Sequence, residues 1–178
     1  MTFKEEMYND FVYDFSNNLR QKIKNIEISK LVFLCIGTNR VIGDCFGPLI
    51  GYKLKNFFRE EENIEVIGDI ENIVSFQNIE RIIKKIKEED AFVIAIDAAL
   101  SCNNNKIGKI MVSQNKMNVG SSINKRNLYI GDISIKGIVA KDYKNSKYNF
   151  KTLQNIPLNI IMNMADCVST GIYNVINV

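Results

Sequence analysis

The stretch LVFLCIGTNRVIGDCFGPLIG, residues 31–51, joins an apolar run to a glycine-rich loop and then to a second apolar segment. Residues 31–36 are continuously apolar and rich in strand formers, which is typical of a strand buried on both faces of a parallel sheet. Gly37 ends that run, and Pro48 suits the first turn of a helix. Because apolar residues continue at helical spacing beyond Pro48, the stretch predicts a strand, a loop and a helix in that order.

The same alternation recurs along the rest of the chain. The pattern predicts strands over residues 64–67, 91–96, 107–112, 130–139 and 158–162. It predicts helices over residues 5–25, over residues 79–86 after a capping Ser75, and over residues 166–175. No segment between the strands of residues 106–140 is long enough for a crossover helix. We therefore expect an α/β fold, a three-layer α/β/α sandwich with a mostly parallel sheet and a β insertion after the third strand.

The composition is that of one ordinary domain. The chain has 178 residues, of which 46% are hydrophobic and 24% charged, enough to bury a core. We find no linker or internal repeat and expect a single domain over residues 1–178, with residues 1–28 as an N-terminal helical extension. That helix is expected to pack as a cover; a role as a subunit contact or as a removable block on the cleft stays open.

The absence of histidine excludes several classes of active site. The chain contains none, so Ser-His-Asp triads, Cys-His pairs and H-E-x-x-H zinc sites cannot form. The four cysteines have no C-x-x-C spacing, which argues against a zinc ribbon or a thioredoxin-type site and favours reduced thiols. Any proton transfer must therefore use carboxylates, lysine, tyrosine or thiols.

Charge and hydropathy patterns indicate a cytoplasmic protein. No apolar stretch approaches the about 18 residues of a membrane span, and the acidic N-terminus does not resemble a signal peptide. The net charge of +3 is unevenly spread, since residues 60–90 are mainly acidic and residues 101–151 mainly basic. Such blocks usually serve solubility, although the basic one could guide an acidic partner. No nucleic-acid-binding pattern is found, so neither nucleic acid nor membrane is an expected partner.

Two aspartates lie where a parallel sheet places ligand sites. Asp97 directly follows the apolar run 91–96, and Asp44 lies in the loop between residue 36 and the helix that begins near Pro48. Each alone could equally serve as a cap or turn residue. If their strands are neighbours, repulsion would raise one pKa, so that one carboxyl acts as acid and the other as base. The same pair could instead bind a divalent cation through its oxygens.

Three further residues are candidates for binding substrate. Arg40 and Lys125 could contact an oxyanion or a substrate carboxylate, and Gly43 lies in the same loop as Asp44. That loop has neither the G-x-G-x-x-G nor the P-loop spacing, which argues against a nucleotide. Cys45 near a helix N-terminus could be a nucleophile, but without histidine a packing role is favoured.

The quoted stretch, together with Ala95-Ile-Asp-Ala-Ala-Leu100 and Gly131-Asp-Ile-Ser-Ile-Lys-Gly-Ile-Val139, resembles the YyaC-type sporulation proteins of endospore-forming bacteria. The resemblance spans about residues 31–172 and leaves out the N-terminal helix. That family is similar to the germination protease and to hydrogenase maturation endopeptidases, which implies a phosphorylase/hydrolase-like fold. It also implies that Asp44, in the D-x-x-G-P loop, and Asp97, in the I-D-A segment, are the catalytic aspartates.

The sequence departs from the family pattern at several points. The histidine with which hydrogenase proteases bind nickel is missing, which favours a pair of aspartates without metal. Asn39 stands where many relatives have Asp, and Ser101 follows Leu100 where a glycine is expected. These changes could alter substrate entry without changing the aspartate pair.

The resemblance and the aspartates together predict a sporulation-associated peptidase that needs no cofactor. Its partner would be a protein or peptide substrate such as a spore protein, in the cytoplasm of a sporulating cell or inside the spore. One alternative is a non-catalytic binding protein that keeps the peptidase scaffold. Another is a metal-dependent endopeptidase that binds its metal through Asp44 and Asp97. Homo-oligomerisation stays open.

Overall fold

A computed structural model describes residues 2–24, 26–119 and 128–177, and its centre is a five-stranded sheet in the order β2-β1-β3-β7-β4. Its strands are β1 (Leu31–Cys35), β2 (Ile64–Ile67), β3 (Phe92–Ser101), β4 (Ile110–Ser113) and β7 (Ile133–Lys141). β1, β2, β3 and β7 are parallel, and β4 pairs antiparallel with β7 at the edge. A separate antiparallel pair consists of β5 (Met117–Val119) and β6 (Leu128–Ile130). The predicted α/β fold with a mostly parallel sheet is confirmed.

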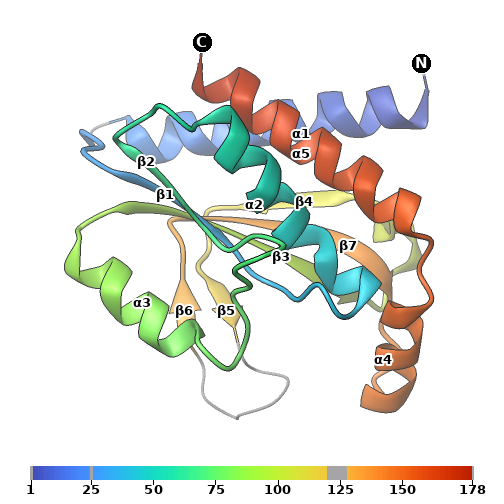
Figure 1. Cartoon of the computed structure of the whole chain (residues 1–178). Coiled ribbons are helices and arrows are strands. Elements are labelled where there is room, and N and C mark those ends of the chain that lie inside the picture. The colour runs from blue at the N-terminus through green and yellow to red at the C-terminus, as the bar shows by residue number, and fades with distance from the viewer. Residues whose placement is uncertain (1, 25, 120–127, 178) are drawn as a thin grey trace.

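Helices cover both faces of the sheet, as Figure 1 shows. On one face lie α1 (Phe3–Ile23), α2 (Phe46–Phe57) and α5 (Leu158–Ile176). On the other face lie α3 (Ile79–Glu88) and the β5–β6 pair. Alternate β1 residues enter the two cores, with Phe33 in the first and Leu34 in the second, because successive strand residues point to opposite faces. The strands are therefore buried on both sides, as their apolar sequences predict.

The strand predicted over residues 158–162 is wrong, because these residues form the first turns of α5. Ile161, Met164 and Val168 are buried at helical spacing, whereas Leu158 and Met162 are exposed. A short apolar run does not by itself distinguish a strand from a helix, and packing against α1 and α2 decides here. A further helix, α4 (Ser146–Gln154), precedes α5 and was not predicted.

The N-terminal helix contributes to the main core. Phe11, Phe15 and Leu19 of α1 are buried, and the rings of Phe11 and Phe15 stack with centroids 5.5 Å apart. At its start, Thr2 and Glu5 form a capping box through reciprocal hydrogen bonds. The predicted helix is thus confirmed, and its buried aromatic residues make it part of the folded core.

Two glycines let α2 lie unusually close to the sheet. A Cβ atom on Gly47 would lie 2.0 Å from the carbonyl oxygen of Ile36, and one on Gly51 would lie 1.9 Å from that of Gly68. No side chain fits at either position without moving backbone. This close contact fixes the loop before α2 against the end of β1. Separately, none of the helices in the described ranges is long and apolar enough to cross a membrane.

Candidate functional site

Asp97 lies on β3, which is hydrogen-bonded between β1 and β7. Residues 92–96 are buried, and from Asp97 onward the strand is half-buried. The expectation that the strand ends before Asp97 is wrong, since β3 continues to Ser101 by pairing with β7. Because side chains alternate along a strand, Asp97 shares a face with Ala95, on the side of α3.

Asp44 reaches the same region from a short 3₁₀ helix, η1 (Ile42–Cys45), between β1 and α2. Its backbone is held on both sides: the amide of Asp44 donates to the carbonyl of Val41 at 3.0 Å, and its carbonyl accepts from the amide of Thr38 at 3.1 Å. β1 and β3 are neighbours in the sheet, and η1 packs against β3. The aspartate-pair hypothesis requires β1 and β3 to be neighbours, and they are.

The two carboxyls have asymmetric electrostatics. Burial raises the pKa of Asp97 to about 8, with a further contribution from the negative charge of Asp44. The backbone amide of Ala98, which donates to the carboxylate, and the charge of Lys136 oppose this rise. Burial also raises the pKa of Asp44. Asp97 is thus the carboxyl that the charge of Asp44 helps to keep protonated, an asymmetry that suits a general acid paired with a general base.

Lys136 is a further candidate residue, which sequence reasoning missed. It lies on β7 directly opposite Asp97 in the parallel register and is half-buried. Ile133 and Ile135 belong to the core on the α2 side, so alternation places Lys136 on the same face as Asp97. A lysine amid the apolar alternation of residues 133–139 was the available signal.

The predicted substrate-binding residues have different surroundings. Arg40 is exposed in the loop after β1, with its backbone amide bonded to Oγ1 of Thr38 at 3.2 Å. Gly43 is buried, and a Cβ there would lie 2.5 Å from Leu153 and 2.9 Å from Ile156. Because glycine has no side chain, η1 can pack closely against α4. Lys125 lies outside the described residues. Substrate binding by these three residues stays a prediction.

Neither a thiol nor a nickel site fits this region. Burial and the charge of Asp44 raise the pKa of Cys45, whose Sγ donates to the carbonyl of Thr38 at 3.3 Å. A nucleophilic cysteine needs the opposite shift. Within the described ranges no three Cys, Asp or Glu residues cluster to bind a metal. Two carboxyls without histidine or a neighbouring thiolate are a poor donor set for nickel.

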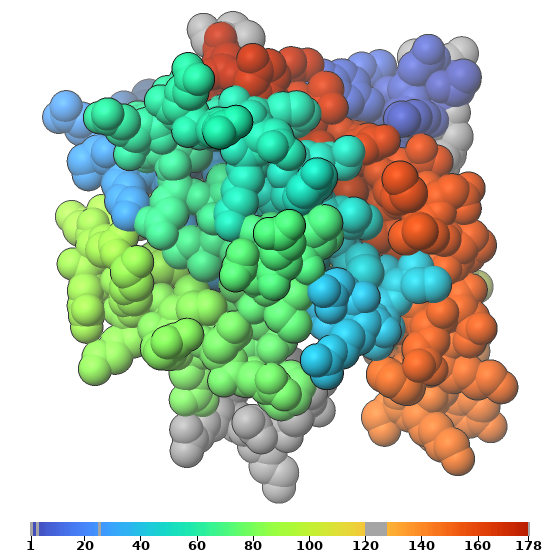
Figure 2. Space-filling view, in the orientation of Figure 1, coloured from blue at the N-terminus to red at the C-terminus, as the bar shows by residue number. Residues whose placement is uncertain are grey.

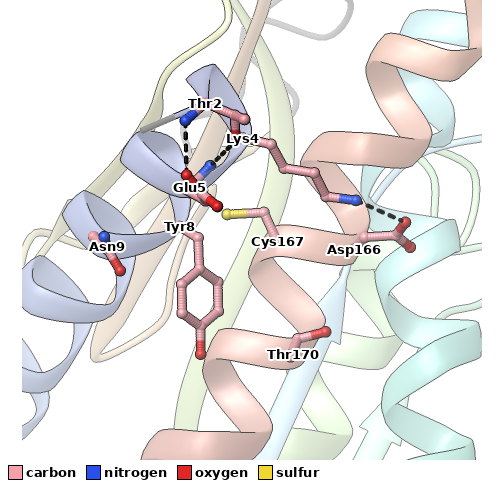
Figure 3. Close-up of a pocket in the computed structure, with 8 residues that line it drawn as sticks. All are labelled: Thr2, Lys4, Glu5, Tyr8, Asn9, Asp166, Cys167 and Thr170. Atoms are coloured by element: carbon pink, nitrogen blue, oxygen red, sulfur yellow. Dashed lines mark hydrogen bonds and ion pairs between the residues drawn. The ribbon is translucent and has the colours of Figure 1, made fainter.

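A groove of about 850 Å³ lies elsewhere, between α1 and α5 (Figure 3). It is lined by Thr2, Lys4, Glu5, Tyr8, Asn9, Asp166, Cys167 and Thr170. Of its acidic residues, Glu5 belongs to the capping box of α1, and Asp166 pairs with Lys53 at 2.8 Å and with Lys4 at 3.8 Å. Burial raises the pKa of the Cys167 thiol to about 12. The groove contains neither Asp44 nor Asp97 and offers no activated nucleophile.

Comparison with known proteins identifies the family. A family model described as "Protein of unknown function (DUF1256)" matches residues 4–171. The chain belongs to the DUF1256 family. The match begins within α1, so the N-terminal helix, which the motif resemblance left out, is part of the family's shared region.

Two relatives of the DUF1256 chain bear out the expected resemblance. It is 33% identical over 144 residues to "Uncharacterized protein YyaC" of Bacillus subtilis (strain 168), covering 80% of this chain and 67% of that protein. Its fold matches that of a [NiFe] hydrogenase maturation protease, HycI from Thermococcus kodakarensis KOD1. That match has a TM-score of 0.59 at 16% identity and covers 90% of this chain and 99% of HycI. The hydrogenase-maturation-protease-like fold is therefore confirmed.

Proposed function

We propose that this DUF1256 protein is a peptidase that hydrolyses peptide bonds with Asp44 and Asp97. The observation that carries the proposal is the pKa of half-buried Asp97, which burial and the negative charge of Asp44 raise to about 8. Such a shift is typical of catalytic acids. Asp97 lies where the buried half of β3 ends, toward the carboxyl ends of the strands at which α/β sheets place their sites. The fold shared with a maturation protease supports the same conclusion as an analogy.

The two carboxyls would divide the proton transfers of hydrolysis. Ionised Asp44 takes a proton from water, and the water oxygen attacks the carbonyl carbon while protonated Asp97 donates to the carbonyl oxygen. In the second step the carbon–nitrogen bond breaks, and Asp44 returns its proton to the leaving nitrogen. Asp97 recovers its proton as the carbonyl double bond re-forms. The products are a carboxylic acid and an amine, and both aspartates end in their starting states.

Cations near the pair would stabilise the charge that develops on the carbonyl oxygen. Lys136 lies closest in the sheet register, opposite Asp97. Arg40 follows β1 in the loop that carries Asp44, and we keep it with Gly43 and Lys125 as proposed substrate-binding residues. Positive charge at a developing oxyanion lowers the barrier because the transition state is more negative there than the substrate.

The proposed substrate is a spore protein. The similarity to YyaC and the motif resemblance to sporulation peptidases support a role inside sporulating cells or spores. Small acid-soluble spore proteins are the natural first substrates to test, because the resembled germination protease degrades them.

The test is cleavage of a small acid-soluble spore protein extract by the purified chain. We expect Asp44→Asn and Asp97→Asn each to lower the rate at least about 100-fold, since each removes one proton-transfer group. Asp90→Asn is the matched control, because Asp90 is an exposed aspartate in the turn before β3. It should cleave like the unmodified protein, and a chelator should have no effect.

Two outcomes would contradict this function. Cleavage that a chelator abolishes and added metal restores would favour the metal-dependent alternative. An absence of cleavage with continued binding of a spore protein would favour the non-catalytic binding alternative.

A further inference from the structure

The outward side of α4 and of the loop before it is basic and aromatic, and the proposed hydrolysis does not use it. We call it the α4 surface; it comprises Lys141, Lys144, Lys147, Lys151, Tyr143, Tyr148 and Phe150. Its aromatic residues are strongly exposed to solvent: the exposed fraction is 64% for Tyr148 and 53% for Phe150. Figure 1 shows α4 projecting at one end of the molecule, below the start of α5.

The helix separates an inner face from this outer one. Asn149 and Leu153, one turn apart, are half-buried and face the protein. Lys147 and Lys151, also one turn apart, are exposed on the opposite side. The basic face is therefore fixed by the amphipathic pattern of a packed helix.

The loop before α4 is held in place, which keeps its aromatic residues together. Asp142 accepts hydrogen bonds from Nδ2 of Asn149 at 2.8 Å and from the amide of Lys144 at 2.7 Å. The rings of Tyr143 and Tyr148 lie 6.5 Å apart, and Nζ of Lys141 lies 5.6 Å from the centre of the Tyr143 ring. Pre-ordered side chains lose less entropy when a partner binds.

The four lysines of the surface have one carboxylate in their own segment, Asp142, whose charge interacts with that of Lys144. The sequence has no Asp or Glu between Asp142 and Asp166. Among the described residues, no ion pair joins a carboxylate to Lys141, Lys144, Lys147 or Lys151. A partner that supplies carboxylates and apolar side chains would complement this surface, since it would satisfy both the lysines and the exposed rings.

The helix that carries the α4 surface packs against the candidate site through its inner face. Leu153 of α4 and Ile156 lie against Gly43, which directly precedes Asp44. Beyond α4, Leu158 and Met162 add exposed apolar side chains at 49% and 45% exposure. A polypeptide bound on the outer side of α4 would therefore lie across this one helix from η1, which holds Asp44.

We propose that the α4 surface is a docking site for an acidic segment of the protein substrate, one that also carries apolar or aromatic residues. The identity of the partner as a substrate rests on the proposed peptidase function. The surface would hold the substrate near Asp44 and so select proteins by a segment separate from the cleaved bond. Such docking would add substrate selectivity that the aspartate pair lacks, because the pair would contact only the peptide group being cleaved.

The test measures binding by fluorescence anisotropy in the Asp97→Asn protein. The probe is a short fluorescein-labelled peptide of repeated Glu-Glu-Phe units, compared with a Gln-Gln-Phe peptide and with oligothymidylate. We expect the acidic peptide to bind at least about tenfold more tightly than the Gln peptide, and more weakly as salt rises. The triple variant Lys144→Gln, Lys147→Gln, Lys151→Gln should weaken that binding at least about fivefold.

The matched control removes three exposed lysines elsewhere, Lys24→Gln, Lys84→Gln and Lys87→Gln, which keeps the net charge equal to that of the test variant. It should bind the acidic peptide like its parent. Equal binding of both peptides, no effect of the α4 variant, or tighter binding of oligothymidylate would overturn the proposal. Because the parent carries Asp97→Asn, this result is independent of whether the unmodified protein cleaves.

Discussion

At the scale of single residues, comparison of buried Asp69 with half-buried Asp97 shows why Asp97 is a candidate acid. Asp69 is only 4% exposed, yet its pKa is lowered: burial would raise it, but Lys55 and the amides of Asn72 and Glu71 hydrogen-bond to the carboxylate. Asp97 receives one such backbone bond and faces a like charge, so its pKa rises. A carboxyl whose pKa is shifted upward in this way is a candidate functional group.

The raised pKa of Asp97 predicts a pH-dependent stability. In the unfolded chain its pKa is near 3.8 and in the folded protein it is about 8, so the folded state binds more protons between these values. This group's stabilising contribution is therefore complete below about pH 4 and is lost as the pH rises to about 8. Asp97→Asn should raise the free energy of unfolding by about 5 kcal/mol at pH 8, and by little at pH 4.

Urea denaturation at several pH values measures this difference. Asp90→Asn is again the control, since Asp90 is exposed and its replacement should change stability equally little at every pH. A stability gain for Asp97→Asn that does not grow with pH would show that the carboxyl is ionised in the folded protein.

Lys136 should lower the pKa of Asp97. Its positive charge opposes the rise in the pKa of Asp97, so Lys136→Met should raise that pKa further. Because the proposed acid must be protonated, the alkaline limit of kcat/KM should move to higher pH in the variant. A pH–rate profile measures the limit, and carboxyl NMR of Asp97 measures the pKa directly. Lys136→Arg should restore the original limit, and an unmoved NMR pKa in Lys136→Met would contradict the assignment.

At the scale of elements, the position of Asp44 depends on how closely α2 lies on the sheet. Gly51 faces the carbonyl of Gly68 so closely that an added Cβ would lie 1.9 Å from its oxygen. A second contact comes from Gly137 on β7, whose missing side chain makes room for the ring of Phe46 at the start of α2. Small residues on both elements therefore allow the helix to approach, and the η1 segment with it.

Gly51→Ala should destabilise the protein by about 3 kcal/mol despite the better helix propensity of alanine, because backbone must move to accept the methyl group. Thermal or urea unfolding measures the change. Tyr52→Ala, at the next position of the same helix and 46% exposed, is the control and should cost about 0.5 kcal/mol or less. Equal stability of the two variants would show that α2 can shift without cost.

At the scale of the whole molecule, the first and last helices close the core together. α1 and α5 pack side by side over the sheet, as Figure 2 also shows for the exterior, where their surfaces adjoin. Phe11 lies against Gly171, at which a Cβ would be 2.8 Å from the ring. Nδ2 of Asn174 donates to the hydroxyl of Tyr8 at 2.7 Å. The N-terminal helix is thus bound to the last helix by aromatic packing and a polar contact.

Loss of the packing between α1 and the core should lower the stability of the protein. Phe15 is fully buried, so Phe15→Ala should lower the free energy of unfolding by about 3–5 kcal/mol through lost apolar burial and a cavity. Tyr13→Ala, on the exposed side of α1, should change it by about 0.5 kcal/mol or less. If a chain cut after α1 stays folded and cleaves substrate faster, the helix is a removable block instead.

Sequence and structure contributed differently to the candidate site. The motif resemblance marked Asp44 and Asp97, and the neighbouring places of β1 and β3 bring their segments together. Lys136 could not be assigned, because its position opposite Asp97 depends on the register between β3 and β7, whose paired residues are about 40 positions apart. The continuation of β3 from Asp97 to Ser101 also depends on its pairing with β7.

The sequence by itself determined the elements whose pattern is local. β1, β2 and the buried half of β3 are runs of strand formers, and the missing histidines restrict proton chemistry to other groups. Only the tertiary structure decided that α5 begins at Leu158 and that Asp97 has a raised pKa. The physical reason is that both depend on what packs against the residue. A short apolar run forms the strand or helix that best buries its side chains against neighbouring elements. The pKa of a carboxyl depends on the charges and solvent around it.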